Sequence, residues 1–178
     1  MMIICTMERR LFLTDNLIFI HGLISSGQGF KGEYFRRIFP NCLTPDFEKY
    51  HERIPMKTLL NKRMEQLNQV LNKKEKWIII GSSFGGLMAT LYAIHNPEKI
   101  EKLILLAPFL LREELLPKNI NPIEVPVKIY HGRNDKVIPI EDNKNKAYLI
   151  FNNLMFYMVE DDHQLHNTVK SLKWLELI

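Results

Sequence analysis

The chain has 178 residues, of which 46% are hydrophobic and 25% are charged, with a formal net charge of +4 at pH 7. This length and composition are typical of one globular domain, so we expect residues 1–178 to form a single domain with one substantial core. The mild positive charge gives little support to nucleic-acid binding, and no apolar run approaches the roughly 20 residues that a membrane span needs.

The N-terminal segment is apolar first and turns basic only at Arg9 and Arg10. A secretory signal has the reverse order, so we expect the protein to be cytoplasmic. Residues 10–13 indicate a short strand. The two cysteines, Cys5 and Cys42, are far apart and lack the spacing of a metal site or a disulfide framework, so we expect buried reduced thiols and no metal.

The first clear element is the run 17–20, which is apolar without alternation and ends at His21-Gly22. Continuous hydrophobicity over this length predicts a strand buried on both faces, as in the middle of a parallel sheet. The elements expected next are a glycine- and serine-rich loop over 23–31, a short helix over 32–39 closed by Pro40, and a brief strand over 42–47 that runs into a turn.

A long amphipathic helix is expected to begin at Pro55, because proline suits the first turn of a helix. Its apolar side chains recur at helical spacing and predict a face packed on the core. These side chains are Met56, Leu59, Leu60, Met64, Leu67, Val70 and Leu71. The basic residues of this region have Asn and Glu between them, which indicates a solvated face. They are Lys57, Lys62, Arg63, Lys73, Lys74 and Lys76.

The stretch 77–87 runs from an apolar, β-branched strand through small residues into a helix. Within it Gly81, Ser83 and Gly85 fit the G-x-S-x-G pattern, which places a serine on a strained turn above the edge of a sheet. Ser82 does not fit, because its flanking positions are not glycine. A tight strand-to-helix connection without catalysis is the alternative interpretation.

The rest of the chain continues to alternate strands and helices. The expected elements are the end of this helix at Pro97, a strand over 103–106, a short connection over 109–125 with a turn or two of helix over 110–116, a strand over 127–132, a helix from near Pro139, a strand over 154–159, and a terminal helix capped by Asn167 that runs through Trp174 and Leu175. This rhythm predicts an α/β fold, a three-layer α/β/α sandwich with a mostly parallel central sheet.

Three of the expected strands are followed by side chains that can carry catalysis: Ser83, Asp135 and His163. In α/β sheets ligands bind beyond the carboxyl ends of the strands, so these residues are candidates for one site. A serine hydroxyl needs a base to become a nucleophile, and an acid can orient that base. The alternatives are His166 for the base and, for the acid, Glu160, Asp161 and Asp162.

Ester chemistry also needs hydrogen-bond donors for the negative charge that develops on the carbonyl oxygen. The candidates are the backbone N–H groups of Phe84, directly after the serine, and of Leu23, in the loop after the first clear strand. His21 and His131 also follow strands, and we expect both to be structural.

Gly27, Gly29 and Gly32 spell G-x-G-x-x-G, with Asp46 at about the right distance for a ribose ligand. The dinucleotide fingerprint begins where the strand ends, whereas here residues 21–26 intervene. The loop also lacks the Lys-Ser/Thr ending of a phosphate-binding loop. We therefore expect no cofactor.

Four segments together resemble the signature segments of the α/β-hydrolase superfamily: 20–23, 81–86, 131–139 and 162–165. The small size and the short connection after Pro108 are similar to small lidless bacterial esterases of the YqiA-like group. The resemblance implies a compact fold without a lid, with the following roles: Ser83 as nucleophile, Asp135 as acid, His163 as base, and Leu23 and Phe84 as oxyanion donors. The chain departs from the family in lacking the first antiparallel strand pair and a glycine immediately before Asp161.

We therefore expect a serine hydrolase that cleaves carboxylic esters or thioesters of small to medium acyl groups through an acyl-enzyme. The loop positions place Phe84, Phe109, Leu110 and Leu111 as lining of an acyl pocket. A peptidase, a C–C bond hydrolase or an acyltransferase would use the same residues. The alternative from another class is a protein-interaction module that kept the fold with weak or vestigial activity. Nothing in the sequence indicates an oligomeric state.

Overall fold

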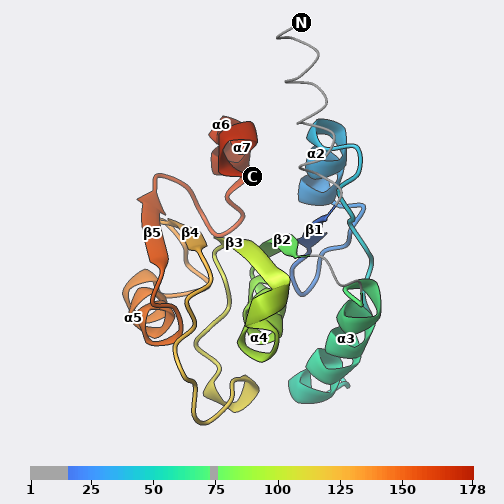
Figure 1. Ribbon diagram of the computed structural model, residues 1–178, viewed down its shortest axis with the longest axis vertical. Coiled ribbons are helices and arrows are strands. Elements are labelled where there is room, and N and C mark those ends of the chain that lie inside the picture. The colour runs from blue at the N-terminus through green and yellow to red at the C-terminus, as the bar shows by residue number, and fades with distance from the viewer. Residues whose placement is uncertain (1–15, 73–75) are drawn as a thin grey trace, which may run out of the picture.

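A computed structural model describes residues 16–72 and 76–178 of the chain, and the strand expected over 10–13 lies outside them. Five parallel strands form one sheet in the order β1-β2-β3-β4-β5 (Figure 1). They are β1 (Leu17–Ile20), β2 (Trp77–Ser82), β3 (Ile100–Leu106), β4 (Val127–Gly132) and β5 (Leu154–Val159). The predicted parallel sheet is confirmed.

Helices cover both faces of the sheet (Figure 1). One layer consists of α2 (Phe30–Ile38), α6 (His166–Ser171) and α7 (Trp174–Leu177); the other consists of α3 (Met56–Val70), α4 (Phe84–His95) and α5 (Ile140–Ile150). The predicted three-layer sandwich is therefore confirmed. None of the helices in 16–72 and 76–178 has the length and hydropathy to cross a membrane.

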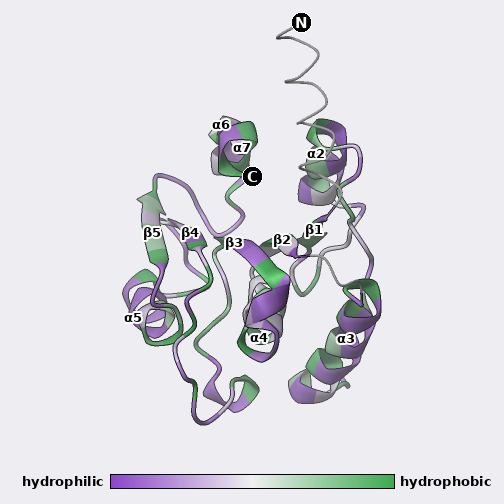
Figure 2. Cartoon of the chain, in the orientation of Figure 1, coloured by the Kyte–Doolittle hydropathy of each residue, from purple (hydrophilic) through white to green (hydrophobic). Residues whose placement is uncertain are grey.

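The strands are apolar without alternation because each face of the sheet has its own core. Leu17 and Phe19 of β1 pack with α2 and α7 on one side, whereas Ile18 and Ile20 pack with α3 and α4 on the other. α3 mixes hydrophobic and hydrophilic residues along its length, as Figure 2 shows. Such a helix buries one side on the sheet and leaves the other in water. In α4, by contrast, the residues from Phe84 to Ala93 are all buried.

The prediction of a short strand over 42–47 is wrong, because only Leu43 pairs with the sheet. Leu43 forms an isolated parallel bridge with Ile18 on the side of β1 away from β2. Its N–H donates to Leu17 O at 2.9 Å, but Pro45 has no N–H with which to extend the ladder. From β1 the chain passes through α2 to Leu43 on one side of β1, and then through α3 to β2 on the other side. The direction in which the chain winds along the sheet therefore reverses at β1.

Three helix predictions also need correction. α2 begins at Phe30, two residues before the expected start. The terminal helix is split into α6 and α7, and Asn167 lies inside α6 rather than capping it. The cap residue is Leu165, which has a φ of 53°, and the carboxylate of Asp161 accepts the Thr168 N–H at 2.8 Å. The helix expected over 110–116 is only a 3-10 turn, η2 (Glu113–Leu115).

Cys42 is buried and forms no disulfide. Burial raises the pKa of its thiol to about 12, so the group stays protonated at neutral pH. This agrees with the expected buried thiol, whereas Cys5 lies outside the described residues.

Candidate active site

Ser83 occupies the turn between β2 and α4 in a strained backbone conformation. Its φ of 53° and ψ of −114° lie in a region that residues with a Cβ seldom adopt. The turn is held in place because the Ser83 N–H donates to Leu106 O at 2.9 Å and its carbonyl accepts the Phe109 N–H at 3.0 Å. A Cβ on Gly85 would collide with the carbonyl oxygen of Ile20, so glycine is what lets α4 approach β1.

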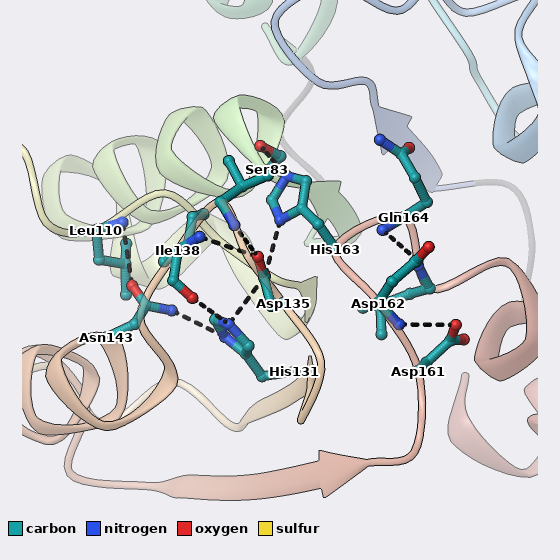
Figure 3. A network of polar contacts seen from close by, with 12 residues as sticks. Ser83, Leu110, His131, Asp135, Ile138, Asn143, Asp161, Asp162, His163 and Gln164 are labelled. Carbon is teal, nitrogen blue, oxygen red and sulfur yellow. Dashed lines mark hydrogen bonds and ion pairs between the residues drawn. The ribbon is translucent and has the colours of Figure 1, made fainter.

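The structure brings together the three side chains that the sequence predicts (Figure 3). His163 Nε2 lies 3.1 Å from Ser83 Oγ, and His163 Nδ1 lies 2.8 Å from Asp135 Oδ2. With its proton on Nδ1, the ring donates to the carboxylate and leaves Nε2 free to accept from the serine hydroxyl. This geometry suits proton transfer between Ser83 and His163.

The Asp135 side chain is fully buried and surrounded by donors. Its Oδ1 accepts the N–H groups of Val137 and Ile138 at 2.8 and 2.9 Å. Its Oδ2 is shared by His163 and by His131, whose Nε2 lies 3.0 Å away. Burial raises the pKa of Asp135, but the hydrogen bonds from His163, Ile138 and Val137 together outweigh it, so the pKa is lowered overall. The carboxylate is therefore ionised at neutral pH.

His131 is the second histidine on this carboxylate, and its own proton is fixed by Asn143 of α5 (Figure 3). The Asn143 amide donates to His131 Nδ1 at 3.2 Å, which leaves Nε2 as the ring donor to Asp135 and to Ile138 O. Burial lowers the pKa of His131 and favours the neutral ring. The sequence missed Asn143, although its spacing to the buried Ala147 and Ile150 was a signal.

The alternative residues are engaged elsewhere. The His166 ring packs on Phe30, with 4.3 Å between centroids, and the exposed Glu160 pairs with Arg133 at 2.9 Å. Asp161 accepts the Thr168 N–H of α6, as described above. Asp162 Oδ1 accepts the Gln164 N–H at 2.8 Å, which shapes the turn that presents His163 without a preceding glycine.

The backbone N–H groups of Leu23 and Phe84 belong to residues that line the same cavity as Ser83. Phe84 is the first residue of α4, where N–H groups have no partner within the helix. Among the described residues, neither of these two N–H groups donates to another protein atom. Both are available to an oxygen bound beside Ser83.

Arg63 of α3 holds this region from inside the protein. The expectation of a solvated Arg63 is wrong, because its side chain is fully buried. Its Nη2 donates to Leu23 O at 2.9 Å and its Nε to Glu48 O at 2.8 Å, while the guanidinium lies 5.4 Å from the centre of the Phe84 ring. Burial lowers the pKa of Arg63 to about 10, so it stays charged at neutral pH. Its spacing to Leu59 and Leu67 could have revealed that it lies on the buried face.

His21 supports the same loop, as the sequence predicts. Its Nδ1 lies 2.8 Å from Gly22 O, and its Nε2 accepts the Phe47 N–H at 3.3 Å. Burial lowers the pKa of His21, which favours the neutral ring. Arg63 and His21 thus fix the carbonyl groups of the loop whose N–H groups face the cavity.

A cavity of about 300 Å³ lies over Ser83 and His163. Phe84 and Phe109 line it, as expected from their loop positions. The same expectation is wrong for Leu110, which is fully buried in the core, and for Leu111, which does not line the cavity. Apolar Leu23, Ile24 and Val137 and polar Ser25, Lys31 and Gln164 complete much of the wall.

The glycines of the G-x-G-x-x-G pattern serve close packing within the loop. The Gly27 N–H donates to Asp46 Oδ1 at 2.6 Å, and Arg36 donates to Gly27 O at 2.7 Å. A Cβ on Gly32 would collide with that same carbonyl. Asp46 is thus engaged by the protein backbone. Across residues 16–72 and 76–178, no three His, Cys, Asp or Glu side chains are grouped to hold a metal ion.

The family model described as "Alpha/beta hydrolase family" matches residues 46–166 of the chain. No curated protein matches the chain. Similar solved structures include a hydrolase of the alpha/beta superfamily from Xanthomonas campestris, with 23% identity and a TM-score of 0.72 over 87% of this chain and 90% of that one.

Two further similar structures are a complex with a bound ligand and a thioesterase domain. Est1E from Butyrivibrio proteoclasticus, solved with ferulic acid bound, has 18% identity and a TM-score of 0.67 over 90% of this chain and 87% of that one. The thioesterase domain from the curacin biosynthetic pathway has 15% identity and a TM-score of 0.69 over 91% and 90%. At these identities the likeness shows the fold.

Proposed function

The chain belongs to the alpha/beta hydrolase family, and from this premise we propose that it is a serine hydrolase of carboxylic esters or thioesters. Ser83 is the nucleophile, His163 the base, and Asp135 the acid that orients it. The observation that carries the proposal is the unbroken chain of contacts from Ser83 Oγ through the His163 ring to the Asp135 carboxylate.

In the acylation step Ser83 Oγ attacks the substrate carbonyl carbon while His163 Nε2 takes the hydroxyl proton. The ring then carries a positive charge, which the ionised Asp135 stabilises through Nδ1–H. The carbonyl oxygen becomes negative and accepts the N–H groups of Leu23 and Phe84. When this intermediate collapses, His163 gives its proton to the leaving alcohol or thiol, and the acyl group stays on Ser83.

Deacylation repeats the same steps with water as the nucleophile. His163 Nε2 takes a proton from water as the water oxygen attacks the acyl carbon. Collapse of the second intermediate returns the proton to Ser83 Oγ and releases the carboxylic acid. Losing one oxyanion donor in a comparable site lowers kcat by about a hundredfold to a thousandfold, so the positions of Leu23 and Phe84 are central to the rate.

The size of the cavity supports small to medium acyl groups. Its volume of about 300 Å³ is at the lower end of the range of about 300–1,000 Å³ for small-molecule sites. The ferulic acid bound to Est1E and the thioesterase name of another neighbour make esters and thioesters the first substrates to test.

Ser83→Ala tests the proposal, with Ser82→Ala as the matched control on the neighbouring residue. We expect Ser83→Ala to lower kcat for nitrophenyl esters or acyl thioesters at least about a thousandfold, because the nucleophile is lost. Ser82→Ala should keep most of the activity. A fluorophosphonate probe should label Ser83 in the unmodified protein. Full activity of Ser83→Ala, or labelling of another residue, would contradict the assignment.

A further inference from the structure

Lys31 is the second residue of α2 and lines the same cavity as Ser83 and His163. Among the described residues that line this cavity, it is the only lysine or arginine, and there is no aspartate or glutamate. A substrate bound over Ser83 therefore meets one flexible positive charge and no negative one from the cavity wall.

The contacts of Lys31 do not indicate a structural role for its charge. Asp161 and Asp162 face it, but their carboxylates accept hydrogen bonds from Thr168 and Gln164. In the described part of the chain, Lys31 makes no ion pair within 4.0 Å. It also lies in the first turn of α2, where the helix dipole disfavours a cation.

Burial also disfavours the charged form of Lys31. Burial lowers its pKa to about 8, although the charges of Asp162 and Asp161 act in the opposite direction. The net shift means that the protein destabilises the charged form relative to water. A charge kept in an unfavourable place beside a nucleophile is a candidate for substrate recognition.

The cavity wall also has two exposed apolar side chains. Ile24 is 84% exposed and Val137 is 64% exposed, and both line the cavity. Apolar side chains exposed at a cavity rim can hold the hydrocarbon part of a ligand. The combination fits a substrate with an apolar chain and one anionic group.

We propose that Lys31 binds an anionic group, a carboxylate or a phosphate, on the ester or thioester that Ser83 attacks. This inference rests on the proposed hydrolase function and specifies its substrate class. The Lys31 ammonium donates a charge-assisted hydrogen bond to the anion, while the carbonyl of the substrate lies over Ser83.

Two matched substrate pairs test the inference and distinguish the two anions. The carboxylate pair is a nitrophenyl ester of a dicarboxylic acid with one free carboxylate, and the neutral nitrophenyl ester of the same chain length. The phosphate pair is an acyl thioester of 4′-phosphopantetheine and the same thioester of pantetheine, which lacks only the phosphate. We expect a lower KM for the anionic member of one of these pairs.

Lys31→Met removes the charge at similar length, and Lys31→Arg keeps it. We expect Lys31→Met to raise KM for the preferred anionic substrate about tenfold, the scale of one hydrogen bond to a charged group, and to leave the neutral partner unchanged. Lys31→Arg should retain the preference. Lys57→Met is the control, because it removes the same charge from an exposed site on α3. Equal KM values for both members of both pairs would overturn the inference.

The stability of Lys31→Met is a second readout. A structural role of the Lys31 charge predicts that this variant is less stable than the unmodified protein, whereas the inference predicts that it is more stable. Because the fold disfavours this charge, Lys31→Met should unfold at a higher urea concentration than the unmodified protein. A lower midpoint together with an unchanged substrate preference would assign Lys31 as a counter-ion of Asp161 and Asp162 and overturn the inference.

Binding separates this inference from the proposed function. Calorimetry with Ser83→Ala protein measures the affinity for each member of a pair without turnover. Tighter binding of the anionic member, lost in the Ser83→Ala, Lys31→Met double variant, supports the inference even if no ester is hydrolysed. Equal binding of both members overturns it, whereas hydrolysis by the unmodified protein then still upholds the function.

Discussion

At the scale of single residues, the unusual feature is a carboxylate that serves two histidines. Asp135 Oδ2 lies 2.8 Å from His163 Nδ1 and 3.0 Å from His131 Nε2. His131 therefore restrains the Asp135 carboxylate together with His163, and Asn143 restrains His131 in turn. From these contacts we infer that His131 is a positioning residue for the orientation of His163.

Removing this restraint should lower the rate without weakening substrate binding. We expect His131→Leu to lower kcat about tenfold with little change in KM, because Asp135 loses one of its donors and can turn away from His163. His131→Gln should recover much of the rate, since its amide can donate from nearly the same place. Steady-state kinetics on one ester measure both values, and equal kcat for His131→Leu and the unmodified protein would contradict the role.

At the scale of elements, α3 contributes to the candidate site through Arg63. Its Arg63 donates to carbonyl groups of the loop that carries Leu23 and lies against the ring of Phe84. A single buried cation thus contacts both residues whose N–H groups are assigned to the oxyanion. The spacing between these two donors depends on how α3 packs.

Arg63→Met should impair both folding and turnover. It leaves the part-buried carbonyls of Leu23 and Glu48 without this donor, at up to about 1–3 kcal/mol for each group. We expect a lower free energy of unfolding, measured in urea, and a kcat reduced at least tenfold, on the order of a displaced oxyanion donor. Lys62→Met is the control, because its side chain is exposed on the same helix. A stable Arg63→Met protein with normal kcat would refute this role.

At the scale of the whole molecule, acid stability depends on carboxylates that the fold keeps ionised. Burial raises the pKa of Asp161, but hydrogen bonds from the Thr168 N–H and hydroxyl, with others from the backbone, outweigh it and lower the pKa. A carboxyl whose pKa is lowered by folding stabilises the protein above the ordinary aspartate value of about 3.9. This contribution is lost as the pH falls through the lowered value.

Asp161→Asn should therefore destabilise the protein at pH 7 and matter less in acid. The amide cannot carry the charge that Asp161 presents to the first turn of α6, so the free energy of unfolding should fall at neutral pH. The difference from the unmodified protein should shrink as the pH is lowered, because protonation removes the same charge from Asp161. Urea unfolding at several pH values checks this, and a difference that grows in acid would contradict the sign.

The sequence predicts much of the fold and the candidate site because both depend on short patterns of neighbouring residues. Apolar runs mark the buried strands, and Ser83, Asp135 and His163 each follow one of them. That all 178 residues form one domain stays a prediction, since residues 1–15 lie outside the description. So does the YqiA-like subgroup.

Features that depend on distant contacts were not predicted. Arginine is usually a surface residue. Arg63 is buried because carbonyl groups from other segments accept its hydrogen bonds. The spacing of Asn143 indicates that it lies on the buried face of α5, but its contact with His131 arises only when α5 packs beside β4. The strand predicted over 42–47 is reduced to one bridge at Leu43 because Pro45 ends the hydrogen-bonded ladder, whereas hydrophobicity alone predicts a longer one.

The bridge at Leu43 also affects how the sheet can meet other chains. An exposed edge strand is a template for pairing with a further strand, and proline is one of the residues that blunts it. Beside β1 the edge offers one paired residue followed by Pro45. At the other edge, β5 carries Met155 and Tyr157, which are 53% and 39% exposed. Pairing with a further strand is therefore disfavoured at the edge beside β1.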